Sequence, residues 1–300
     1  MAIKLKPIDE QVMVITGASS GIGLATAQAA AANGAKLVLA SRNEQALADI
    51  TKSIGAAKSE AIYVVADVAE RSQVQHVADE AIARFGRIDT WVNDAGLSIF
   101  GMIAEVNEQD ARRLFDINFW GVVNGSLVAL PHLQRNGGAL INLGSEVSDA
   151  VVPLEGFYTA SKHAVKGFTD ALRVEIEQLQ KAPVSITLIQ PTAVNTPFPQ
   201  HAKNYMDREP KLPSPQIDPF QVAEAIIDAA TNPTRDIKVG AMSKFNTFMH
   251  KFAPALAEKI EAKQAKRQQF DVPPRRDPDG SLYRPGNDGD IYGPGQTPPA

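Results

Sequence analysis

The sequence predicts a three-layer α/β fold, in which a doubly wound, mainly parallel sheet of seven strands carries helices on both faces. Three observations lead to this prediction. Short apolar runs of strand length alternate with longer segments of helical periodicity. A glycine-rich turn joins the first apolar run to the first helical segment. The chain has 300 residues, enough for one such domain with an appendage.

The apolar runs are the candidate strands. A strand that is buried on both faces is typical of a parallel sheet covered by helices on each side. The runs are Val12–Thr16, Lys36–Ala40, Ala61–Ala66, Thr90–Asn93, Ala139–Leu143, Ser185–Gln190 and Ile237–Val239.

The segments between these runs are the candidate helices. Their apolar residues recur at helical spacing. They are Ile22–Ala32, Glu44–Ser53, Arg71–Phe85, Glu108–Leu133, Phe157–Gln180 and Pro219–Ala230. Because crossovers between parallel strands are right-handed, the carboxyl ends of the strands share one edge, where we expect a ligand.

The character of the sequence changes after about Gly240. Lys244–Gln269 has apolar residues at helical spacing among lysines and glutamates, which predicts an amphipathic helix broken or kinked at Pro254. We expect it to pack on the parent domain or a sister subunit, with peripheral membrane attachment as the alternative. Prolines and glycines dominate Val272–Ala300, an extended or mobile tail that the sheet does not need for folding. The predicted domains are residues 1–243 and a C-terminal extension, residues 244–300.

Composition and charge exclude several classes of function. The net charge is −4, and no block of like charge forms the basic surface of a nucleic-acid binder. The chain has no cysteine, which excludes disulfides, thiolate metal sites and a cysteine nucleophile. Its five histidines lack metal-ligand spacing, so we assign no metal. We find no signal-peptide core or integral membrane segment, and expect a soluble cytoplasmic protein.

The turn after the first strand has the composition of a phosphate-binding loop. Thr16–Gly23 reads TGASSGIG and leads into an alanine-rich helix. Glycines permit a tight turn there and let amide N–H groups, aided by the helix dipole, approach an anionic diphosphate. The GxxxGxG spacing differs from the commoner GxGxxG. The candidate cofactor-binding residues are Gly17, Ser19, Ser20, Gly21, Ile22 and Gly23.

Five ordered motifs over about residues 8 to 240 resemble those of the short-chain dehydrogenase/reductase family. The turn matches the family's TGxxxGIG, and Asn93–Gly96 resembles its NNAG with Asp94 in second place. Asn118 matches a helix-borne asparagine and Ser145 a serine after the fifth strand. Tyr158–Lys162 gives YxxxK, and Pro191–Thr196 resembles PGxVxT with Thr192 for glycine. The resemblance implies a Rossmann-type, NAD(P)-dependent oxidoreductase.

The resemblance also implies roles for single residues. Ser145 holds the substrate oxygen against Tyr158, Lys162 binds the nicotinamide ribose, and Asn118 helps to hold a water that links the lysine to solvent. Further cofactor contacts fall to Asp67, Val68, Asn93, Ala95, Gly96, Pro191, Val194 and Thr196. The family further implies a homodimer or homotetramer, with the helices around Glu108–Leu133 and Phe157–Gln180 pairing across the interface.

Tyr158 is the candidate acid/base. Tyrosine and lysine four residues apart on a helix share a face, so Tyr158 and Lys162 meet beside one ligand. A free phenol has a pKa of about 10, and we expect the ammonium to lower it. Tyr158 then protonates the alkoxide formed when a carbonyl is reduced, or removes the hydroxyl proton of a secondary alcohol.

The end of the second strand indicates the cofactor. A carboxylate there would accept hydrogen bonds from the adenosine ribose and repel a 2′-phosphate, favouring NAD. Here Ser41 takes the place of that acid, and Arg42 beside it offers a guanidinium suited to phosphate. We therefore expect a preference for NADP(H), with NAD(H) as the alternative.

Other functions of the same fold stay open. They are a non-catalytic NADP(H)-binding sensor or scaffold, an NAD-dependent alcohol dehydrogenase, and an epimerase or dehydratase. The intact Ser145, Tyr158 and Lys162 argue against a scaffold. We expect the small-molecule substrate pocket to draw on Leu97–Met102, Glu146–Phe157 and Thr192–Pro215, the last forming a lid over a largely apolar ligand.

Overall fold

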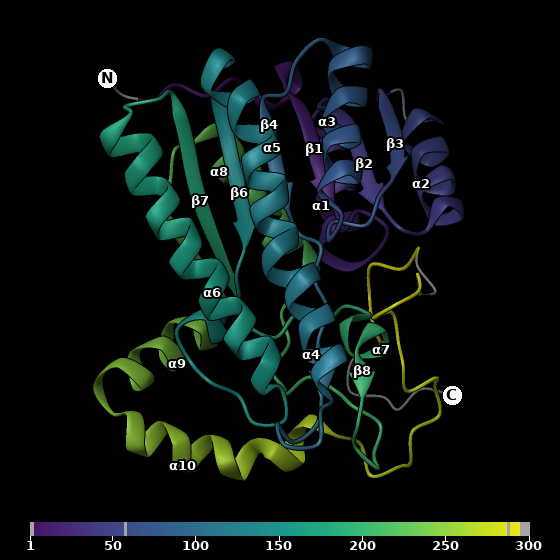
Figure 1. Cartoon of the computed structure of the whole chain (residues 1–300), viewed down its shortest axis with the longest axis vertical. Coiled ribbons are helices and arrows are strands. Elements are labelled where there is room, and N and C mark those ends of the chain that lie inside the picture. The colour runs from purple at the N-terminus through teal and green to yellow at the C-terminus, as the bar shows by residue number, and fades with distance from the viewer. Residues whose placement is uncertain (1–2, 57–58, 287–288, 295–300) are drawn as a thin grey trace.

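A seven-stranded parallel sheet forms the centre of the molecule (Figure 1). The computed structural model describes residues 3–56, 59–286 and 289–294. The strand order is β3-β2-β1-β4-β6-β7-β9. All seven predicted strands are confirmed to within one residue at each end, as β1 Val12–Thr16, β2 Lys36–Ser41, β3 Ala61–Val65, β4 Thr90–Asn93, β6 Gly138–Leu143, β7 Val184–Pro191 and β9 Asp236–Val239.

Helices cover both faces of this sheet and close two apolar cores. On one face the buried core draws on α1 Gly21–Ala32, α2 Glu44–Ala56 and α8 Pro219–Thr231. On the other face it draws on α3 Arg71–Phe85, α5 Gly121–Asn136 and α6 Gly156–Arg173. The three-layer, doubly wound prediction is therefore confirmed.

The two longest predicted helices are each interrupted by π-helical turns. Glu108–Leu133 divides into α4 Glu108–Phe115, a π-helical segment Asp116–Trp120, and α5. Phe157–Gln180 divides into α6 and a π-helical segment Val174–Leu179. A π turn widens the helix by about one residue and leaves most of the apolar periodicity intact, so the sequence pattern does not reveal it.

Several short elements follow the strand ends. They are 3₁₀ turns at Ile8–Glu10 and Glu146–Ser148, helix α7 Phe198–His201, and a two-stranded parallel sheet of β5 Ile99–Phe100 and β8 Lys203–Asn204. The two-residue strands were not predicted, because an alternating pattern needs about four residues to be recognised. They tie the predicted lid segment, Thr192–Pro215, to the loop after β4.

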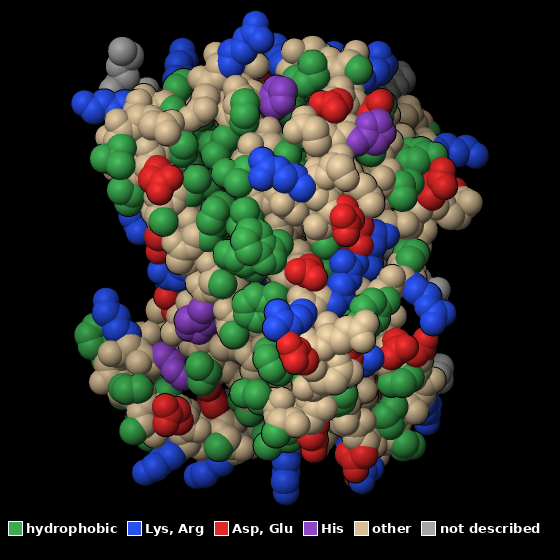
Figure 2. Space-filling view, in the orientation of Figure 1, with side chains coloured by type: hydrophobic (Ala, Val, Ile, Leu, Met, Phe, Trp, Pro, Cys, Tyr) green, Lys and Arg blue, Asp and Glu red, His purple; other side chains and the backbone are tan. Residues whose placement is uncertain are grey.

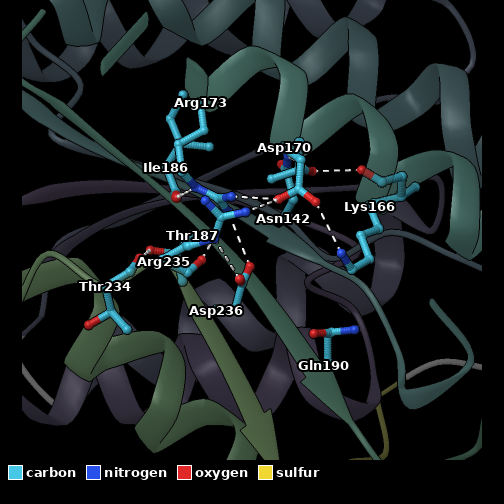
Figure 3. A network of polar contacts seen from close by, with 12 residues as sticks. Asn142, Lys166, Asp170, Arg173, Ile186, Thr187, Gln190, Thr234, Arg235 and Asp236 are labelled. Carbon is cyan, nitrogen blue, oxygen red and sulfur yellow. Dashed lines mark hydrogen bonds and ion pairs between the residues drawn. The ribbon is translucent and has the colours of Figure 1, made fainter. Parts of the chain in front are cut away.

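A buried polar network fixes helix α6 to the sheet (Figure 3). The Arg173 guanidinium donates to the carbonyl of Ile186 on β7 at 2.8 Å and to that of Arg235 at 3.0 Å. It also donates to Asp170 at 2.6 Å, and Asp170 accepts from Lys166 at 3.0 Å. Arg173 is 4% exposed, so its charge is paired largely away from water, while Asp170 and Lys166 are partly exposed; together the contacts hold α6 against β7.

The C-terminal extension begins with two helices, α9 Ala241–Phe252 and α10 Pro254–Gln264, and a 3₁₀ turn Ala265–Gln268. The predicted break at Pro254 is confirmed. Both helices lie below the carboxyl ends of the strands in Figure 1. Within the described part of the chain, no helix has the length and apolar character needed to cross a membrane.

The described part of the tail, residues 272–286 and 289–294, contains no helix or strand, as predicted. It is nevertheless packed on the domain, and the yellow segment in Figure 1 runs back toward the carboxyl edge of the sheet. Leu282 is fully buried and belongs to the same apolar core as Val68 and Leu114. The tail therefore adds a buried apolar side chain to this core, and the expectation that the sheet folds without the tail stays a prediction.

Candidate active site

A cavity lies at the carboxyl edge of the sheet, beside β1 and β4. These two strands are neighbours, with Thr16 paired to Asn93, and the chain leaves them toward opposite halves of the sheet. Such a switch point is where ligands bind in open α/β sheets. The predicted site residues that line this cavity are Gly17, Ser19, Ser20, Gly21, Ile22, Ser41, Arg42, Asp67, Val68, Ala95, Gly96, Ser145, Tyr158, Lys162, Pro191, Val194 and Thr196.

The glycines of the first turn leave room that side chains would fill. Gly17 has φ +73°, and a Cβ there would lie 2.8 Å from the backbone of Ala95. Gly21 has φ +52° and faces Thr196. Gly23 does not line the cavity; a Cβ there would lie 2.3 Å from the Gly17 carbonyl oxygen. The turn therefore brings backbone without side chains to the start of α1, which suits an anionic diphosphate, and in this structure its Gly21 amide donates to the Asp290 carbonyl at 2.9 Å.

Helix α6 brings Tyr158 and Lys162 to the same cavity wall as Ser145. Lys162 is 5% exposed, and its Nζ donates to the Leu143 carbonyl oxygen at 2.7 Å. The Ser145 side chain caps the turn Glu146–Ser148, accepting from the Val147 amide at 3.3 Å. The Tyr158 ring packs edge-on against Phe198, with centroids 5.4 Å apart.

The expected lowering of the Tyr158 pKa is wrong in this structure. Desolvation raises the pKa of the phenol above its usual 10, and the carboxylate of Glu155 raises it further, against a hydrogen bond with Ser145. Desolvation also lowers the pKa of Lys162 to about 8, opposed by the charge of Asp94. The prediction missed this because it counted the charge of the lysine, and neither the burial of the phenol nor the three carboxyl groups around it.

Those three carboxyl groups, Asp94, Glu146 and Glu155, line the cavity and were not named as site residues. Glu155 accepts hydrogen bonds from Ser98 at 2.7 Å and Gln268 at 3.2 Å, and burial raises its pKa to about 7. Burial likewise raises the pKa of Asp94 to about 7, opposed by the charge of Lys162. Asp94 departs from the family motif, and Glu146 and Glu155 fall within the predicted pocket segment Glu146–Phe157, but no chemical role was predicted for any of the three.

Two predicted residues lie behind the cavity instead of lining it. Asn118, in the π-helical segment, is fully buried and donates to the Leu97 carbonyl at 2.9 Å and to Ser161 at 3.0 Å. It therefore joins the loop after β4 to helix α6. Asn93 accepts from Trp91 at 2.8 Å and donates to Asn142 at 2.8 Å, so its side chain ties β4 to β6.

The end of the cavity beside β2 contains groups from four parts of the chain. Arg42 and Asp67 lie there, and Arg113 of α4 pairs with Asp67. The tail contributes Ser281, Pro285 and Gly286 to the same lining. Sequence patterns gave no signal for these tail residues, because their position depends on the path of an irregular segment.

The substrate end of the cavity is mixed in character. The predicted segments contribute mainly apolar residues, together with Glu146, Glu155 and His201; the apolar ones are Leu97, Val147, Val152, Phe198, Leu212 and Pro213. Helix α9 borders this end, where Asn246 donates to Glu146 at 3.0 Å.

Comparisons with known proteins agree with this architecture. A family model described as short chain dehydrogenase matches residues 11–206. Uncharacterized oxidoreductase YxnA of Bacillus subtilis (strain 168) is 44% identical over 264 residues, which cover 87% of this chain and 74% of that protein.

Two solved structures are also similar. One is an alcohol dehydrogenase from the archaeon Thermococcus sibiricus complexed with 5-hydroxy-NADP, at 28% identity and a TM-score of 0.67, covering 76% of this chain and 94% of that one. The other is a short chain dehydrogenase/reductase from Burkholderia phymatum in complex with NAD, at 28% identity and a TM-score of 0.75, covering 89% and 99%. The chain therefore belongs to the short-chain dehydrogenase/reductase family, and it is an oxidoreductase that acts on a CH–OH or C=O group.

Proposed function

We propose that the protein is an NADP(H)-dependent carbonyl reductase, or the corresponding secondary-alcohol dehydrogenase, with Tyr158 as its general acid/base. The observation that carries this proposal is one continuous cavity. Its lining includes the glycine turn at one end and Ser145, Tyr158 and Lys162 at the other. A dinucleotide bound along it supplies a hydride to carbon or accepts one from it.

The side chains have complementary tasks in this proposal. Tyr158 donates its hydroxyl proton to the substrate oxygen during reduction and takes it back during oxidation. The Ser145 hydroxyl donates a hydrogen bond to the same oxygen and stabilises its developing charge. Lys162 is held by the Leu143 carbonyl, which leaves its ammonium fixed beside Tyr158 and within reach of ribose hydroxyls. Asn118 acts through Leu97 and Ser161 and keeps this wall in position.

The cofactor choice rests on Ser41 and Arg42. Both line the cavity, and a carboxylate that would repel a 2′-phosphate is replaced by the Ser41 hydroxyl. A charge-assisted hydrogen bond is worth about 1.5–3 kcal/mol, so Arg42 would give about a ten- to hundred-fold preference for NADP(H). The raised pKa of Tyr158 also suits the direction of reduction, because the phenol holds its proton until an alkoxide forms.

Dissociation constants for NADPH and NADH test the cofactor proposal. The wild type should bind NADPH more tightly, and Ser41→Asp/Arg42→Ala should lose or reverse that preference. Arg135→Ala, an exposed change at the far end of α5, is the matched control and should leave the preference unchanged. Tighter binding of NADH by the unmodified protein would contradict the proposal.

We propose a substrate with an apolar body. The support is the side-chain set at the Tyr158 end of the cavity, where the lining is mainly apolar and also includes the carboxyl groups of Glu146 and Glu155. A panel of aliphatic, aromatic and alicyclic ketones, followed at the NADPH absorbance, tests this class. Preference for small charged ketones over all of them would contradict it.

We also propose a homodimer or homotetramer. The helices expected to pair carry exposed apolar side chains, with Trp120 at 52%, Val174 at 49% and Leu179 at 73% exposure. Figure 2 shows hydrophobic side chains gathered over the region of α5 and α6. A large unpartnered apolar patch is typical of an interface. Sedimentation of the wild type and of Trp120→Glu/Leu179→Glu tests this, and a wild-type monomer at micromolar concentration would contradict it.

A further inference from the structure

The described part of the tail lies on the side of the molecule that holds Arg42 and the glycine turn. We call residues 277–286 and 289–294 the C-terminal strap. Its first part is held on α4 and β8. Asp279 pairs with Lys203 at 2.8 Å, and the Tyr283 hydroxyl donates to Asp110 at 2.6 Å. Desolvation acts to raise the pKa of Asp110, but hydrogen bonds from Lys203, Tyr205 and Tyr283 outweigh it and lower that pKa. The Asp110 carboxylate therefore stays ionised.

The middle of the strap contacts Arg42, one of the two residues expected to choose the cofactor, and Arg113 of α4. The Arg42 guanidinium donates to the carbonyl oxygens of Ser281 and of Leu282, the latter at 3.3 Å. Arg113 donates to the same Leu282 carbonyl at 3.2 Å while pairing with Asp67. The strap backbone therefore bridges the cations that border the β2 end of the cavity.

The end of the strap contacts the phosphate-binding turn. The Gly289 amide donates to the Ser19 carbonyl at 2.9 Å, and the Gly21 amide donates to the Asp290 carbonyl at 2.9 Å. Further along, the Tyr292 hydroxyl donates to Asp218 at 3.2 Å. The strap is thus fixed on both sides of the β2 end of the cavity, by Arg42 on one side and the glycine turn on the other.

The glycines of the strap lie close to the domain. A Cβ on Gly280 would lie 2.4 Å from the Ala202 carbonyl oxygen, and one on Gly293 would lie 2.3 Å from that of Thr196. A segment that was exposed to solvent would not need glycine at these positions, because no neighbouring backbone would lie so close to it. The glycine-rich composition therefore serves close packing here, as well as irregular backbone.

We propose that the C-terminal strap is a part of the cofactor site, which holds Arg42 for the adenosine 2′-phosphate and closes over the bound cofactor. This inference rests on the proposed NADP(H) function. A guanidinium has five N–H donors, so two strap carbonyls can orient Arg42 without preventing it from binding a phosphate. In this proposal the carbonyl groups of Ser281 and Leu282 position the Arg42 guanidinium.

The cavity lining indicates that the strap covers the cofactor site and does not fill it. Ser281, Pro285 and Gly286 line the same cavity as Gly17, Arg42 and Asp67, so the strap forms one wall of the space. A cofactor lying along that space would be enclosed between the sheet edge and the strap. It follows that the strap must detach from Arg42 and the glycine turn each time the cofactor exchanges.

The test compares cofactor release from the full chain with release from two variants. One is a chain that ends at Arg276. The other, Asp279→Asn/Tyr283→Phe, weakens the anchor on Lys203 and Asp110 without shortening the chain. The matched control is Tyr63→Phe/Asp271→Asn, which changes the same residue types outside the strap. Stopped-flow fluorescence measures NADPH and NADH dissociation rates when excess NADP⁺ or NAD⁺ displaces the bound cofactor.

We expect both strap variants to release NADPH at least ten-fold faster than the wild type and to lose several-fold of the NADPH preference, while the control keeps wild-type values. Wild-type release rates in both variants would overturn the strap proposal and leave the cofactor proposal standing. Tighter NADPH binding after truncation would also overturn it, since the tail would then occupy the cofactor site.

Faster release from both variants, in a wild type with no preference for NADPH, would support closure of the strap over the cofactor. It would refute the selection of NADP(H) by Arg42. A wild type that binds neither dinucleotide would overturn both proposals.

Discussion

The Lys162 ammonium donates a hydrogen bond to the carbonyl oxygen of Leu143, the last residue of β6, at 2.7 Å. This contact joins helix α6 to the strand that ends beside Ser145. The Arg173 network fixes the other end of the same helix to β7. Tyr158 lies one helical turn before Lys162 on this anchored helix, and is therefore held at a set position on the cavity wall, as an acid/base that must meet a small reacting group requires.

The first prediction concerns the proton donor. Tyr158→Phe removes the phenol and keeps the ring that packs on Phe198, so cofactor affinity should change little. Turnover should fall by at least about 10²-fold, the usual contribution of general acid–base catalysis. Steady-state rates and NADPH titration on one confirmed substrate measure both. The control is Tyr63→Phe, a half-exposed position on β3, which should keep full turnover. Near-wild-type turnover of Tyr158→Phe would require another acid/base.

The second prediction concerns the glycine turn. Gly23→Ala places a Cβ 2.3 Å from the Gly17 carbonyl oxygen, which is too close for van der Waals contact, so the turn must shift. We expect NADPH affinity to fall by at least ten-fold while the far-ultraviolet circular dichroism stays that of a folded chain. Gly167→Ala is the matched control, because a Cβ there meets nothing within 4 Å and alanine favours helix α6. Unchanged NADPH affinity in Gly23→Ala would show that the turn does not hold the cofactor.

The third prediction concerns Glu155. Burial raises the pKa of its carboxyl from 4.5 to about 7, so between these values the folded protein binds more protons than the unfolded chain. Its contribution to stability is therefore present below pH 4.5 and is lost as the pH rises toward 7. Glu155→Gln should consequently gain stability relative to wild type over this interval, by at most about 3 kcal/mol at about 1.4 kcal/mol per pH unit.

Urea unfolding at pH 4.5, 6, 7 and 8 measures this difference. Glu224→Gln, an exposed change on α8, is the control and should show a small difference that does not vary with pH. A stability difference for Glu155→Gln that is the same at all four values would show that Glu155 titrates alike in the folded and unfolded chain.

The sequence predicted the sheet well because its strands are buried on both faces and need continuous apolar runs, as in β1 and β7. The sequence also predicted that Ser145 and the glycine turn lie at the same edge of the sheet, because the carboxyl ends of parallel strands share one edge. Side-chain direction was harder to predict. Asn93 and Asn118 have the expected positions along the chain, but their amides are used by Trp91, Asn142, Leu97 and Ser161 behind the cavity.

The tail and the carboxyl cluster could not be predicted for a different reason. Leu282 becomes buried, and Ser281 reaches Arg42, through a chain path with no repeating pattern. The pKa of Tyr158 is raised by burial of the phenol and, beyond that, by the carboxyl groups of Glu155 and Asp94 from separate loops, and only the fold establishes that burial and that proximity. Local sequence patterns report periodic burial and turn chemistry, and they do not report which irregular segments meet.

Transfer of a labelled hydride tests the central claim most directly. The protein is incubated with NADPH carrying deuterium on either face of nicotinamide carbon 4 and with the ketone panel, and the products are analysed by mass spectrometry and NMR. The account predicts an alcohol with one deuterium on the carbinol carbon, from one face only, formed at least about 10²-fold more slowly by Tyr158→Phe. NADPH that binds to the protein and transfers no deuterium to any carbonyl would contradict the account.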